Sequence, residues 1–302
     1  MAQVTVVMPA YNEAGAIGDT IRKIRTSFEN TPITCGIIVV DDGSSDNTGE
    51  QAERAGATVL RHPRNIGYGN ALLTGIANAD SPIVAITDAD GTYPVDELPS
   101  MVEEMNVRGL DMLVGARQGK FYHGSFIKRI SRIAFKALAE FTVGQNIPDI
   151  NSGLRVMRRE MIMKFAPVLC GGFSFTTTIT VIAMLTNYFV DYRPIKYHER
   201  VGSSHVRYFR DTLRTAQILI MAILMFNPIK LFLLASGFVG AFGLIAVVLS
   251  LFVPSLNLPI LLASLFFLTA VIILSLGFIA EQRRAHMERI SSSRNEVRFP
   301  GS

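Results

Sequence analysis

Short β-branched runs alternate with helical repeats over the first part of the chain. Ile17, Ile21, Ile24 and Phe28 recur at spacings of four, three and four, which places them on one face of a helix. Strand-like runs precede and follow this helix, and such alternation predicts βαβ units and a mostly parallel sheet. The expected strands are Val4–Met8, Ile37–Val40, Ala57–Leu60, Ile83–Thr87 and Met112–Gly115.

The segment from Leu231 to Ala280 contains no Asp, Glu, Lys, Arg or His. The sequence PSLNLP at 254–259 divides it into two apolar runs, Ile229–Val253 and Leu258–Ala280, each about 35 Å long as a helix. Because the hydrocarbon core of a bilayer is about 30 Å thick, the pattern predicts a two-helix transmembrane hairpin. The apolar run Thr212–Phe226 before it predicts an interfacial helix.

Basic residues lie on both sides of the hairpin, whereas its connecting turn is uncharged. The positive-inside rule therefore predicts an integral membrane protein, of the plasma membrane in a prokaryote, with both termini in the cytosol. The N-terminus enters a strand directly, so we expect no cleavable signal. The expected divisions are a cytosolic α/β domain at 1–210, an interfacial helix at 211–228, two transmembrane helices at 229–280 and a disordered cytosolic tail at 281–302.

Composition agrees with this division. The 302 residues are 49% hydrophobic and 18% charged, with a mean hydropathy of +0.32, which excludes a disordered chain and argues against a wholly soluble one. A net charge of +4 is too small for a nucleic-acid-binding protein. Two cysteines, Cys35 and Cys170, cannot form a disulfide framework, which fits a reducing compartment.

Polar side chains follow three of the expected strands, in the segments 9–13, 41–46 and 88–91. Ligands of parallel α/β sheets bind beyond the carboxyl ends of the strands, so these segments are expected to form one site. Asp88 and Asp90 stand two residues apart at a strand end, where both can approach one divalent cation, Mg²⁺ or Mn²⁺. The alternative is a capped turn without a metal ion.

Asp41 and Asp42 end the second expected strand. We expect them to hydrogen-bond a nucleotide, although the following GSSDNT could instead form an Asx turn or a helix N-cap. The tripeptide GYG at 67–69 lacks the third glycine of a dinucleotide-binding loop and favours a tight turn under the nucleotide. His62 is isolated and is interpreted as a surface or hydrogen-bonded structural residue.

A basic stretch follows the last expected strand. No acidic residue occurs from Met112 to Ala139, and Phe126–Phe141 has helical periodicity. The basic face is either simply solvated or directed at anionic lipid, where each Lys or Arg contributes about 1 kcal/mol. The predicted transmembrane hairpin would place this face near a membrane, which favours the alternative that it is directed at anionic lipid. The basic residues are Arg117, Lys120, Lys128, Arg129, Arg132 and Lys136.

Seven motifs extend over about residues 3–206, in the order VVMPAYNE, IIVVDDGSSDNT, RNIGYGNAL, ITDADGTYP, VGAR, PDINSGLRVM and HERVGSSH. Their order resembles glycosyltransferase family 2. Within it the chain is similar to the polyprenyl-phosphate branch, the dolichyl-phosphate mannose synthases and bacterial relatives that glycosylate a lipid phosphate. The resemblance implies a GT-A fold, a Rossmann-like nucleotide-binding sheet.

The resemblance also implies roles for the strand-end residues. Asp88 and Asp90 would hold the metal ion on the donor diphosphate. The family often continues this motif with Leu-Gln, whereas this chain has Gly91-Thr92, so Thr92 or water would supply the third ligand. The residues implied to hold the nucleotide are Pro9, Tyr11, Glu13, Asp41, Asp42 and Asp88.

Further residues match family positions that approach phosphate groups. Arg117 and Arg200 match phosphate-binding arginines, whose planar guanidinium can bind phosphate in bidentate fashion. Arg129, Ser131 and Arg132 match a basic helix that approaches the lipid phosphate. The family's last motif usually ends in Ser-Lys; this chain has Ser204-His205, which retains Ser204 and makes the next charge pH-dependent.

The expected acceptor defines the mechanism. A phosphate monoester is already an anionic nucleophile, so attack on the anomeric carbon needs no strong base and inverts the configuration. The metal ion and arginines stabilise charge on the leaving diphosphate. Asp149 stands where sugar-accepting relatives keep a base, but we expect it to orient the arginines or the sugar, or to be a helix N-cap. Ser152 and Arg155 are expected to support the same turn.

Three functions compete. An inverting transferase from a UDP- or GDP-hexose to undecaprenyl or dolichyl phosphate uses every feature named, with a slight preference for UDP. A processive polysaccharide synthase requires a QxxRW motif, which a chain without Trp excludes. A non-catalytic, membrane-anchored nucleotide-sugar-binding protein predicts a broken aspartate pair or missing arginines, yet Asp88, Asp90, Arg117 and Arg200 are present.

The hairpin carries two further expectations. Two helices are too few to flip a glycolipid, so we expect a separate flippase as partner. Gly237, Gly240 and Gly243 allow close helix packing, which is compatible with a homo-oligomer.

Overall fold

The structure is a computed structural model that describes residues 2–118, 136–137, 139–169, 175–198, 220–221, 223–224, 227–252 and 258–298. The side chains of residue 258 and residues 286–298 are outside this description. The chain divides into two compact units, Met1–Leu219 and Ile220–Ser302, which are considered separately below.

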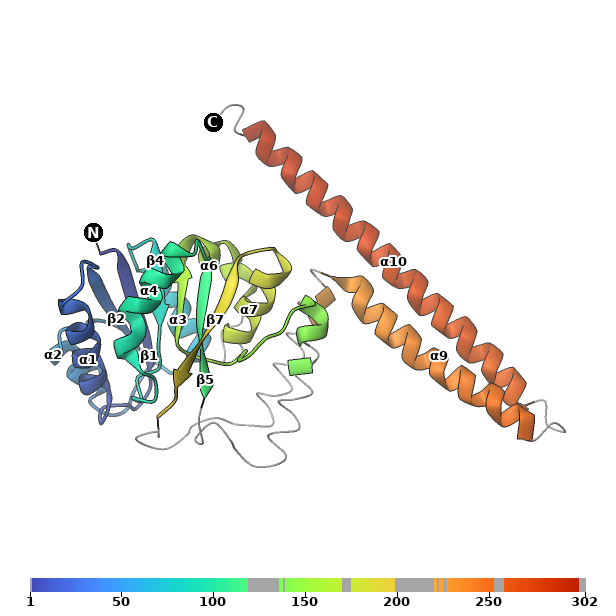
Figure 1. Ribbon diagram of the computed structural model, residues 1–302, viewed down its shortest axis with the longest axis horizontal. Helices are drawn as coiled ribbons and strands as arrows, with labels where there is room; N and C mark the ends of the chain where they lie inside the picture. Colours follow the sequence, from blue (N-terminus) through green and yellow to red (C-terminus); the bar gives the residue numbers. More distant parts are fainter. Residues whose placement is uncertain are drawn as a thin grey trace. The chain divides into compact units, whose positions relative to one another are not determined.

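The first unit alternates strands with helices, as the sequence pattern predicts (Figure 1). The strands are β1 Val4–Ala10, β2 Cys35–Asp41, β3 Thr58–Arg61, β4 Ile83–Ile86, β5 Met112–Gln118, β6 Arg155–Arg158 and β7 Val190–Lys196. The helices are α1 Ile17–Glu29, α2 Thr48–Arg54, α3 Tyr68–Ala77, α4 Leu98–Val107, α6 Arg159–Phe165 and α7 Phe175–Leu185, with 3₁₀ turns η1 Val95–Glu97 and η3 Ala166–Val168.

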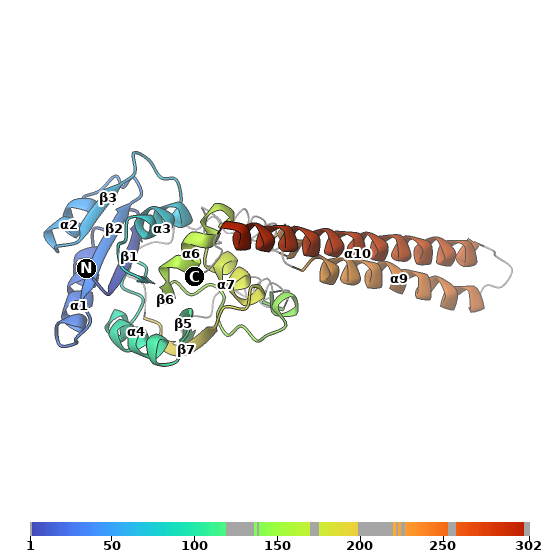
Figure 2. The same ribbon diagram turned by 90° about the horizontal axis from the view of Figure 1, so that it is seen from above.

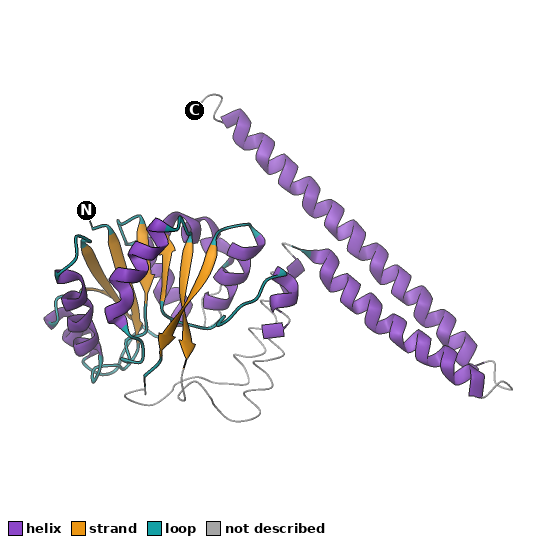
Figure 3. Cartoon of the chain, viewed as in Figure 1, coloured by secondary structure: helices purple, strands orange, loops and turns teal. Residues whose placement is uncertain are grey.

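The described strands form one sheet (Figure 3), and their order in it is β3-β2-β1-β4-β6-β5-β7. β1 pairs in parallel with β2 and β4, β2 with β3, and β5 with β7. β6 is antiparallel to both of its neighbours, β4 and β5. The five expected strands are confirmed. The sequence pattern did not predict β6 or β7. In the sheet, β6 lies between β4 and β5, which are consecutive among the five expected strands.

Successive side chains along β1 point to opposite faces of the sheet, as in any β-strand. Val4, Val6 and Met8 join the core cluster formed with α1 and α4. Val7 faces α3, where a Cβ on Gly75 would collide with the Val7 side chain. Glycine at this position therefore allows α3 to approach the sheet closely.

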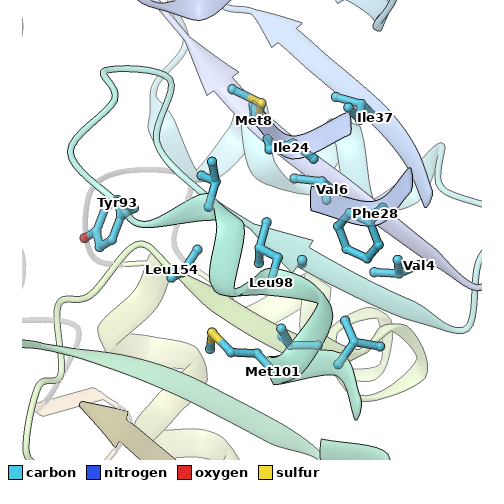
Figure 4. Packing of buried hydrophobic residues seen from close by; sticks show 14 of the residues in the cluster. Val4, Val6, Met8, Ile24, Phe28, Ile37, Tyr93, Leu98, Met101 and Leu154 are labelled. Atoms are coloured by element: carbon cyan, nitrogen blue, oxygen red, sulfur yellow. The ribbon is translucent and has the colours of Figure 1, made fainter. Parts of the chain in front are cut away.

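The main core lies between the sheet and the helices α1 and α4 (Figure 4). Ile17, Ile21, Ile24 and Phe28 are all buried there, so the helical face predicted from their spacing is confirmed. Tyr93 lies at the edge of this cluster, and its hydroxyl points away from the other labelled side chains in Figure 4. This hydroxyl is part of the candidate site described below.

The second unit contains two long helices, α9 Pro228–Phe252 and α10 Leu258–Arg298, which lie side by side in both views (Figures 1 and 2). Each includes a stretch long and apolar enough to cross a membrane, at Pro228–Phe252 and Pro259–Ala285. Only 11% and 17% of their most apolar windows are buried, so most of these apolar residues are not enclosed within the protein. This exposure fits the predicted transmembrane hairpin and does not fit core helices.

Glycines bring the two helices together. A Cβ on Gly277 would lie 2.5 Å from Phe232 Cβ, and one on Gly243 would lie 3.3 Å from the Phe267 ring. Gly237 differs, because a Cβ there would meet no atom within 4 Å. Of the glycines singled out in the sequence, Gly243 thus packs within the hairpin.

The helix α10 continues well beyond position 280, where the second span was expected to end. The tail expected to be disordered from residue 281 is helical as far as Arg298. Within it, Arg284 donates hydrogen bonds to Glu281, one helical turn earlier. The interfacial helix expected at 211–228 falls largely outside the described residues.

Candidate active site

The carboxyl ends of β1, β2 and β4 lie at the same edge of the sheet, because these strands are parallel and adjacent. Ala10 pairs with Asp41, so the segments that follow β1 and β2 leave the sheet side by side. The third segment, 87–92, follows β4 next to them. The expected convergence of the three polar segments is therefore present in the fold.

The segments after β1 and β2 are joined by hydrogen bonds. The backbone N–H of Asn12 donates to Ser44 Oγ at 3.0 Å, and Asn12 Oδ1 accepts from the Ser45 N–H at 2.8 Å. The Glu13 N–H donates to Thr48 Oγ1 at 2.8 Å. Asn12 has a positive φ of 56°, a conformation that Asn tolerates better than most residues. These bonds hold the predicted nucleoside residues around Asn12 in place.

Asp41 and Asp42 have different surroundings, although both are buried. Asp41 Oδ1 accepts a hydrogen bond from the Ser44 N–H, three residues on, at 2.9 Å, and so holds the segment that follows β2. Asp42 instead binds a distant loop: its Oδ1 accepts from the Ile66 N–H at 3.0 Å and its Oδ2 from the Gly67 N–H at 2.8 Å.

His62 completes the surroundings of Asp42. Its Nδ1 lies 2.7 Å from Asp42 Oδ1 and its Nε2 lies 3.0 Å from Thr74 Oγ1. The interpretation of His62 as a hydrogen-bonded structural residue fits these contacts. Asp42 therefore stabilises the loop that leads into α3.

Asp88, directly after Thr87 at the end of β4, accepts a hydrogen bond on Oδ1 from the hydroxyl of Tyr68 at 3.0 Å. Burial and the Asp88 carboxylate raise the pKa of Tyr68 well above its ordinary value, so the phenol stays protonated and donates. Gly153 leaves room for this carboxylate, because a Cβ there would lie 2.8 Å from Asp88 Oδ1.

Asp90 is buried, and its Oδ1 accepts two hydrogen bonds from Thr92, one from the N–H at 3.1 Å and one from the hydroxyl at 2.6 Å. These bonds orient the carboxylate. Among the described residues, no group of three or more His, Cys, Asp or Glu side chains forms a metal cage. Two carboxylates nevertheless fit Mg²⁺ or Mn²⁺, because these ions commonly bind one or two carboxylates together with water and substrate phosphate.

Arg117, at the end of β5, forms a bidentate ion pair with Asp149. Its Nε lies 2.7 Å from Oδ2 and its Nη2 lies 3.0 Å from Oδ1. The guanidinium also lies over the ring of Tyr197, whose centroid is 5.4 Å from Arg117 Cζ. The Asp149 side chain is 3% exposed and that of Arg117 is 15% exposed, so the pair is largely removed from water.

Tyr93 lies between the aspartate and arginine parts of the site. Its ring packs edge-on against Tyr197 at 5.2 Å, and its hydroxyl accepts a hydrogen bond from the Gly153 N–H at 2.7 Å. Burial raises the pKa of Tyr93, while the charge of Arg117 lowers it and that of Asp88 raises it. Tyr93 therefore lies within the electrostatic reach of both Asp88 and Arg117.

Arg155 lies beneath the turn that carries Asp149 and is fully buried. Its guanidinium donates to the carbonyl oxygens of Ser152 and Ile150, both at 2.8 Å, and to Thr180 Oγ1 at 2.6 Å. Burial lowers the pKa of Arg155, and the nearby Tyr192 and Asp149 oppose this shift. The expected support of the turn by Arg155 agrees with these contacts.

A family model described as "Glycosyl transferase family 2" matches residues 5–165, which is more than half of the chain. The match includes every part of the candidate site described above except α7 and the region of Tyr197. The chain belongs to glycosyltransferase family 2. The resemblance inferred from the motif order is thereby confirmed. The matched residues contain both aspartate pairs, Arg117 and Asp149.

Two relatives of this family 2 chain come from the archaeon Haloferax volcanii. The first, "Low-salt glycan biosynthesis hexosyltransferase Agl6", is 30% identical over 82% of this chain, which spans 59% of that protein. The second, "Dolichyl-phosphate hexose transferase", is 33% identical over 66% of this chain and 84% of that protein. Both names agree with the polyprenyl-phosphate branch of the family.

Solved structures confirm the GT-A fold. Glucosyl-3-phosphoglycerate synthase from Mycobacterium tuberculosis, crystallised with Mn²⁺, UDP-glucose and phosphoglyceric acid, superposes with a TM-score of 0.61 at 18% identity. The match covers 73% of this chain and 79% of the synthase. A second crystal structure of that enzyme holds Mg²⁺ and UDP.

The structure adds site residues that sequence reasoning missed, namely Asn12, Tyr68, Tyr93, Gly153 and Tyr197. Tyr68 stands within RNIGYGNAL, where GYG indicates a tight turn and no local pattern indicates a bond to Asp88. Of the predicted residues, Pro9 lies within β1, and Tyr11 and Glu13 are half-buried in the segment after it. The residues predicted to approach the lipid phosphate other than Arg117 lie outside the described residues: Arg129, Ser131, Arg132, Arg200 and Ser204.

Proposed function

We propose that this family 2 protein is a metal-dependent, inverting hexosyltransferase that moves a hexose from a UDP- or GDP-sugar to polyprenyl phosphate at the cytosolic membrane face. The observation that carries the proposal is the placement of the Asp88–Asp90 pair and the Arg117–Asp149 pair around Tyr93 at one edge of the sheet. The Asp88–Asp90 pair suits a metal-bound diphosphate, and the Arg117–Asp149 pair suits an anionic acceptor.

The donor would lie over the ends of β1, β2 and β4. Asp88 and Asp90 would hold the metal ion, which when bound neutralises the donor diphosphate and stabilises the leaving group. The hydroxyl of Thr92 is a donor to Asp90, which favours water or a substrate oxygen as the next ligand. Asp42 Oδ2 accepts a backbone hydrogen bond from Gly67, and a carboxylate oxygen can accept two, so a nucleoside N–H or O–H fits there.

The acceptor phosphate would approach Arg117. Its guanidinium is held flat by Asp149 and Tyr197, and a held guanidinium presents its remaining N–H groups in a defined direction. The resemblance adds Arg200, Arg129, Arg132, Ser131 and Ser204 as further phosphate contacts. Together these groups reduce the repulsion between two anionic substrates.

Transfer would be a single displacement. A lipid phosphate oxygen attacks the anomeric carbon, the bond from that carbon to the diphosphate oxygen breaks, and the nucleoside diphosphate leaves with the electron pair. The nucleophile is already anionic near neutral pH, so no strong general base is needed. Asp149 is engaged with Arg117 through both oxygens, which supports orientation of that arginine as its role.

The hairpin would anchor the enzyme in the membrane that contains its acceptor. Both α9 and α10 meet the length and hydropathy of a membrane span. Lys230 lies near the start of α9, and Arg283 and Arg284 lie at the C-terminal end of the second apolar stretch. This distribution favours both ends in the cytosol. A separate flippase would then carry the product across.

The test is a transfer assay with the purified full chain in detergent. The protein is incubated with Mn²⁺, undecaprenyl or dolichyl phosphate, and each radiolabelled UDP- or GDP-sugar in turn, and label entering the organic phase is counted. We expect transfer from one donor, loss in Asp90→Asn and Arg200→Ala, and retention in Arg108→Ala. Arg108 is a suitable control because it pairs on the surface with Glu104 and Asp191.

The outcomes separate the candidate functions. Transfer that disappears in the two site variants supports the proposal and identifies the sugar. Metal-dependent nucleotide binding without transfer from any donor would support the non-catalytic nucleotide-sugar-binding protein. Transfer to a water-soluble phosphate, with none to the lipid, would contradict the acceptor assignment alone.

A further inference from the structure

Tyr68 connects two parts of the candidate site that come from different strands. It is the first residue of α3, and its hydroxyl donates to Asp88 Oδ1 at 3.0 Å, beyond the end of β4. The two residues are twenty positions apart in the chain. The position of the Asp88 carboxylate therefore depends on where the start of α3 is held.

The start of α3 is held by Asp42, at the end of β2. The residue before Tyr68 is Gly67, whose N–H donates to Asp42 Oδ2 at 2.8 Å. Gly67 has a φ of 107°, which residues with a Cβ rarely adopt, so the backbone can turn here from the Asp42 contact into the helix. The Ile66 N–H and His62 bind the other oxygen of Asp42.

The connection is partly shielded from water, because Asp42 is buried and both Tyr68 and Asp88 are half-buried. Asp42 is 3% exposed, and its oxygens receive backbone donors that cannot rotate away. Tyr68 is the donor in its bond to Asp88, and the carboxylate oxygen is the acceptor. A hydrogen bond in such surroundings is stronger than in water, so displacement of one end is transmitted to the other.

We propose that Tyr68 is a positioning residue that couples the nucleoside side of the site to the metal side, through the path Asp42, Gly67, Tyr68 and Asp88. Nucleoside contact at Asp42 fixes the 62–67 loop, the loop fixes Tyr68, and Tyr68 holds Asp88 ready for the cation. This proposal rests on the proposed function, because it requires that Asp42 meets the nucleoside and Asp88 meets the metal ion. Binding at either end then favours binding at the other.

The test uses a nucleoside without phosphate groups, because a diphosphate would contact the metal ion directly. Mn²⁺ binding to the full chain in detergent is measured by electron paramagnetic resonance with and without saturating uridine or guanosine. We expect the nucleoside to tighten Mn²⁺ binding about fivefold in the wild type. In Tyr68→Phe, which lacks only the hydroxyl, we expect weaker Mn²⁺ binding and no tightening by the nucleoside.

Tyr188→Phe is the matched control. The Tyr188 hydroxyl lies 3.4 Å from Lys164 Nζ, in an exposed contact that involves neither Asp42 nor Asp88. It should bind Mn²⁺ and respond to nucleoside like the wild type. Asp42→Asn is the second variant, and we expect it to weaken Mn²⁺ binding although Asp42 would not touch the metal ion. Circular dichroism establishes that each variant is folded.

The results distinguish this inference from the proposed function. Wild-type protein that binds Mn²⁺ with UDP, but whose Mn²⁺ affinity is unaffected by bound nucleoside, overturns the coupling and leaves the function intact. A nucleoside effect that persists undiminished in Tyr68→Phe also overturns it. If Tyr68→Phe does not fold, unchanged Mn²⁺ affinity in Asp42→Asn overturns it. Absence of any Mn²⁺ and UDP binding by the wild type overturns both proposals.

Discussion

The guanidinium of Arg117 and the carboxylate of Asp149 meet in two parallel hydrogen bonds, and the backbone N–H of Arg117 adds a third bond to Asp149 Oδ2 at 3.2 Å. The two residues lie 32 positions apart and are both largely buried. An arginine held in this way loses little conformational freedom when it binds phosphate. We therefore propose that Asp149 contributes to the site by orienting Arg117.

Replacing Asp149 by Asn should reduce kcat/KM by about 10- to 100-fold, because Arg117 loses its counter-charge and one strong acceptor. The matched variant is Asp191→Asn, which removes the partner of Arg108 at the surface. Exposed pairs contribute about 0–1 kcal/mol, so this variant should keep nearly full activity. The transfer assay measures both. Equal losses in the two variants would contradict the assigned role of Asp149.

Thr92→Val should weaken Mn²⁺ binding about tenfold, whereas Thr92→Ser should retain it. Valine keeps the shape of the side chain but cannot donate to Asp90 Oδ1, and partners that orient a ligand typically affect metal affinity by 10–100-fold. Calorimetric titration with Mn²⁺ measures the difference. If serine and valine weaken binding equally, the hydroxyl has no orienting role.

Arg155→Met should destabilise the first unit by about 3–5 kcal/mol. The change removes donors from two buried carbonyl oxygens and from Thr180, and the loop that carries Asp149 loses its support. Arg22→Met is the control, because Arg22 pairs with Asp19 on the exposed side of α1. Thermal unfolding followed by circular dichroism suits a chain without Trp. A melting temperature unchanged from wild type would contradict this expectation.

Gly277→Ala should disturb the hairpin and Gly237→Ala should not. The added methyl at Gly277 meets Phe232 Cβ, whereas the one at Gly237 meets no described atom within 4 Å. Overpacking of this kind costs about 1–3 kcal/mol. Proteolysis of the detergent-solubilised chain during heating reports the difference. A larger effect at Gly237 would instead indicate that this position packs against a second copy.

Cys35 should resist thiol reagents in the folded protein. Burial raises the pKa of its thiol to about 12, with smaller opposing effects from the Val6 backbone and Arg25. At pH 8 the thiolate fraction is then roughly 1000-fold below that of an ordinary thiol, so labelling is slow. In a Cys170→Ser background, the labelling rate should keep rising with pH beyond 9, whereas that of the unfolded chain levels off.

The same shift has a consequence for stability. Above about pH 9 the thiol of the unfolded chain releases its proton while that of the folded chain keeps it, so the unfolded state binds fewer protons and stability falls as pH rises. Cys35→Ala should reduce this loss between pH 9 and 11. Thermal unfolding across this range measures it, and an identical pH dependence in the variant would contradict the assignment to Cys35.

Periodic local patterns in the sequence determined much of the fold. The alternation of β-branched runs predicted β1 to β5, and the spacing of Ile17 and Ile21 predicted the buried face of α1. The absence of charge from Leu231 to Ala280 predicted both long apolar helices. These features depend on neighbouring residues along the chain. The carboxylates at the ends of β2 and β4 were found for the same reason, since a parallel sheet places such ends together.

Tertiary structure decided what those carboxylates contact. The hydrogen bonds of Tyr68 to Asp88, of Gly67 to Asp42 and of Arg117 to Asp149 join residues 20 to 32 positions apart, and no local period specifies such pairs. The insertion of β6 between β4 and β5 is equally non-local, and it brings the turn with Asp149 and Gly153 to the site. The spacing of residues in the sequence specified which side chains share one face of a helix or one end of the sheet. The packing of the whole sheet specified which of those side chains contact each other.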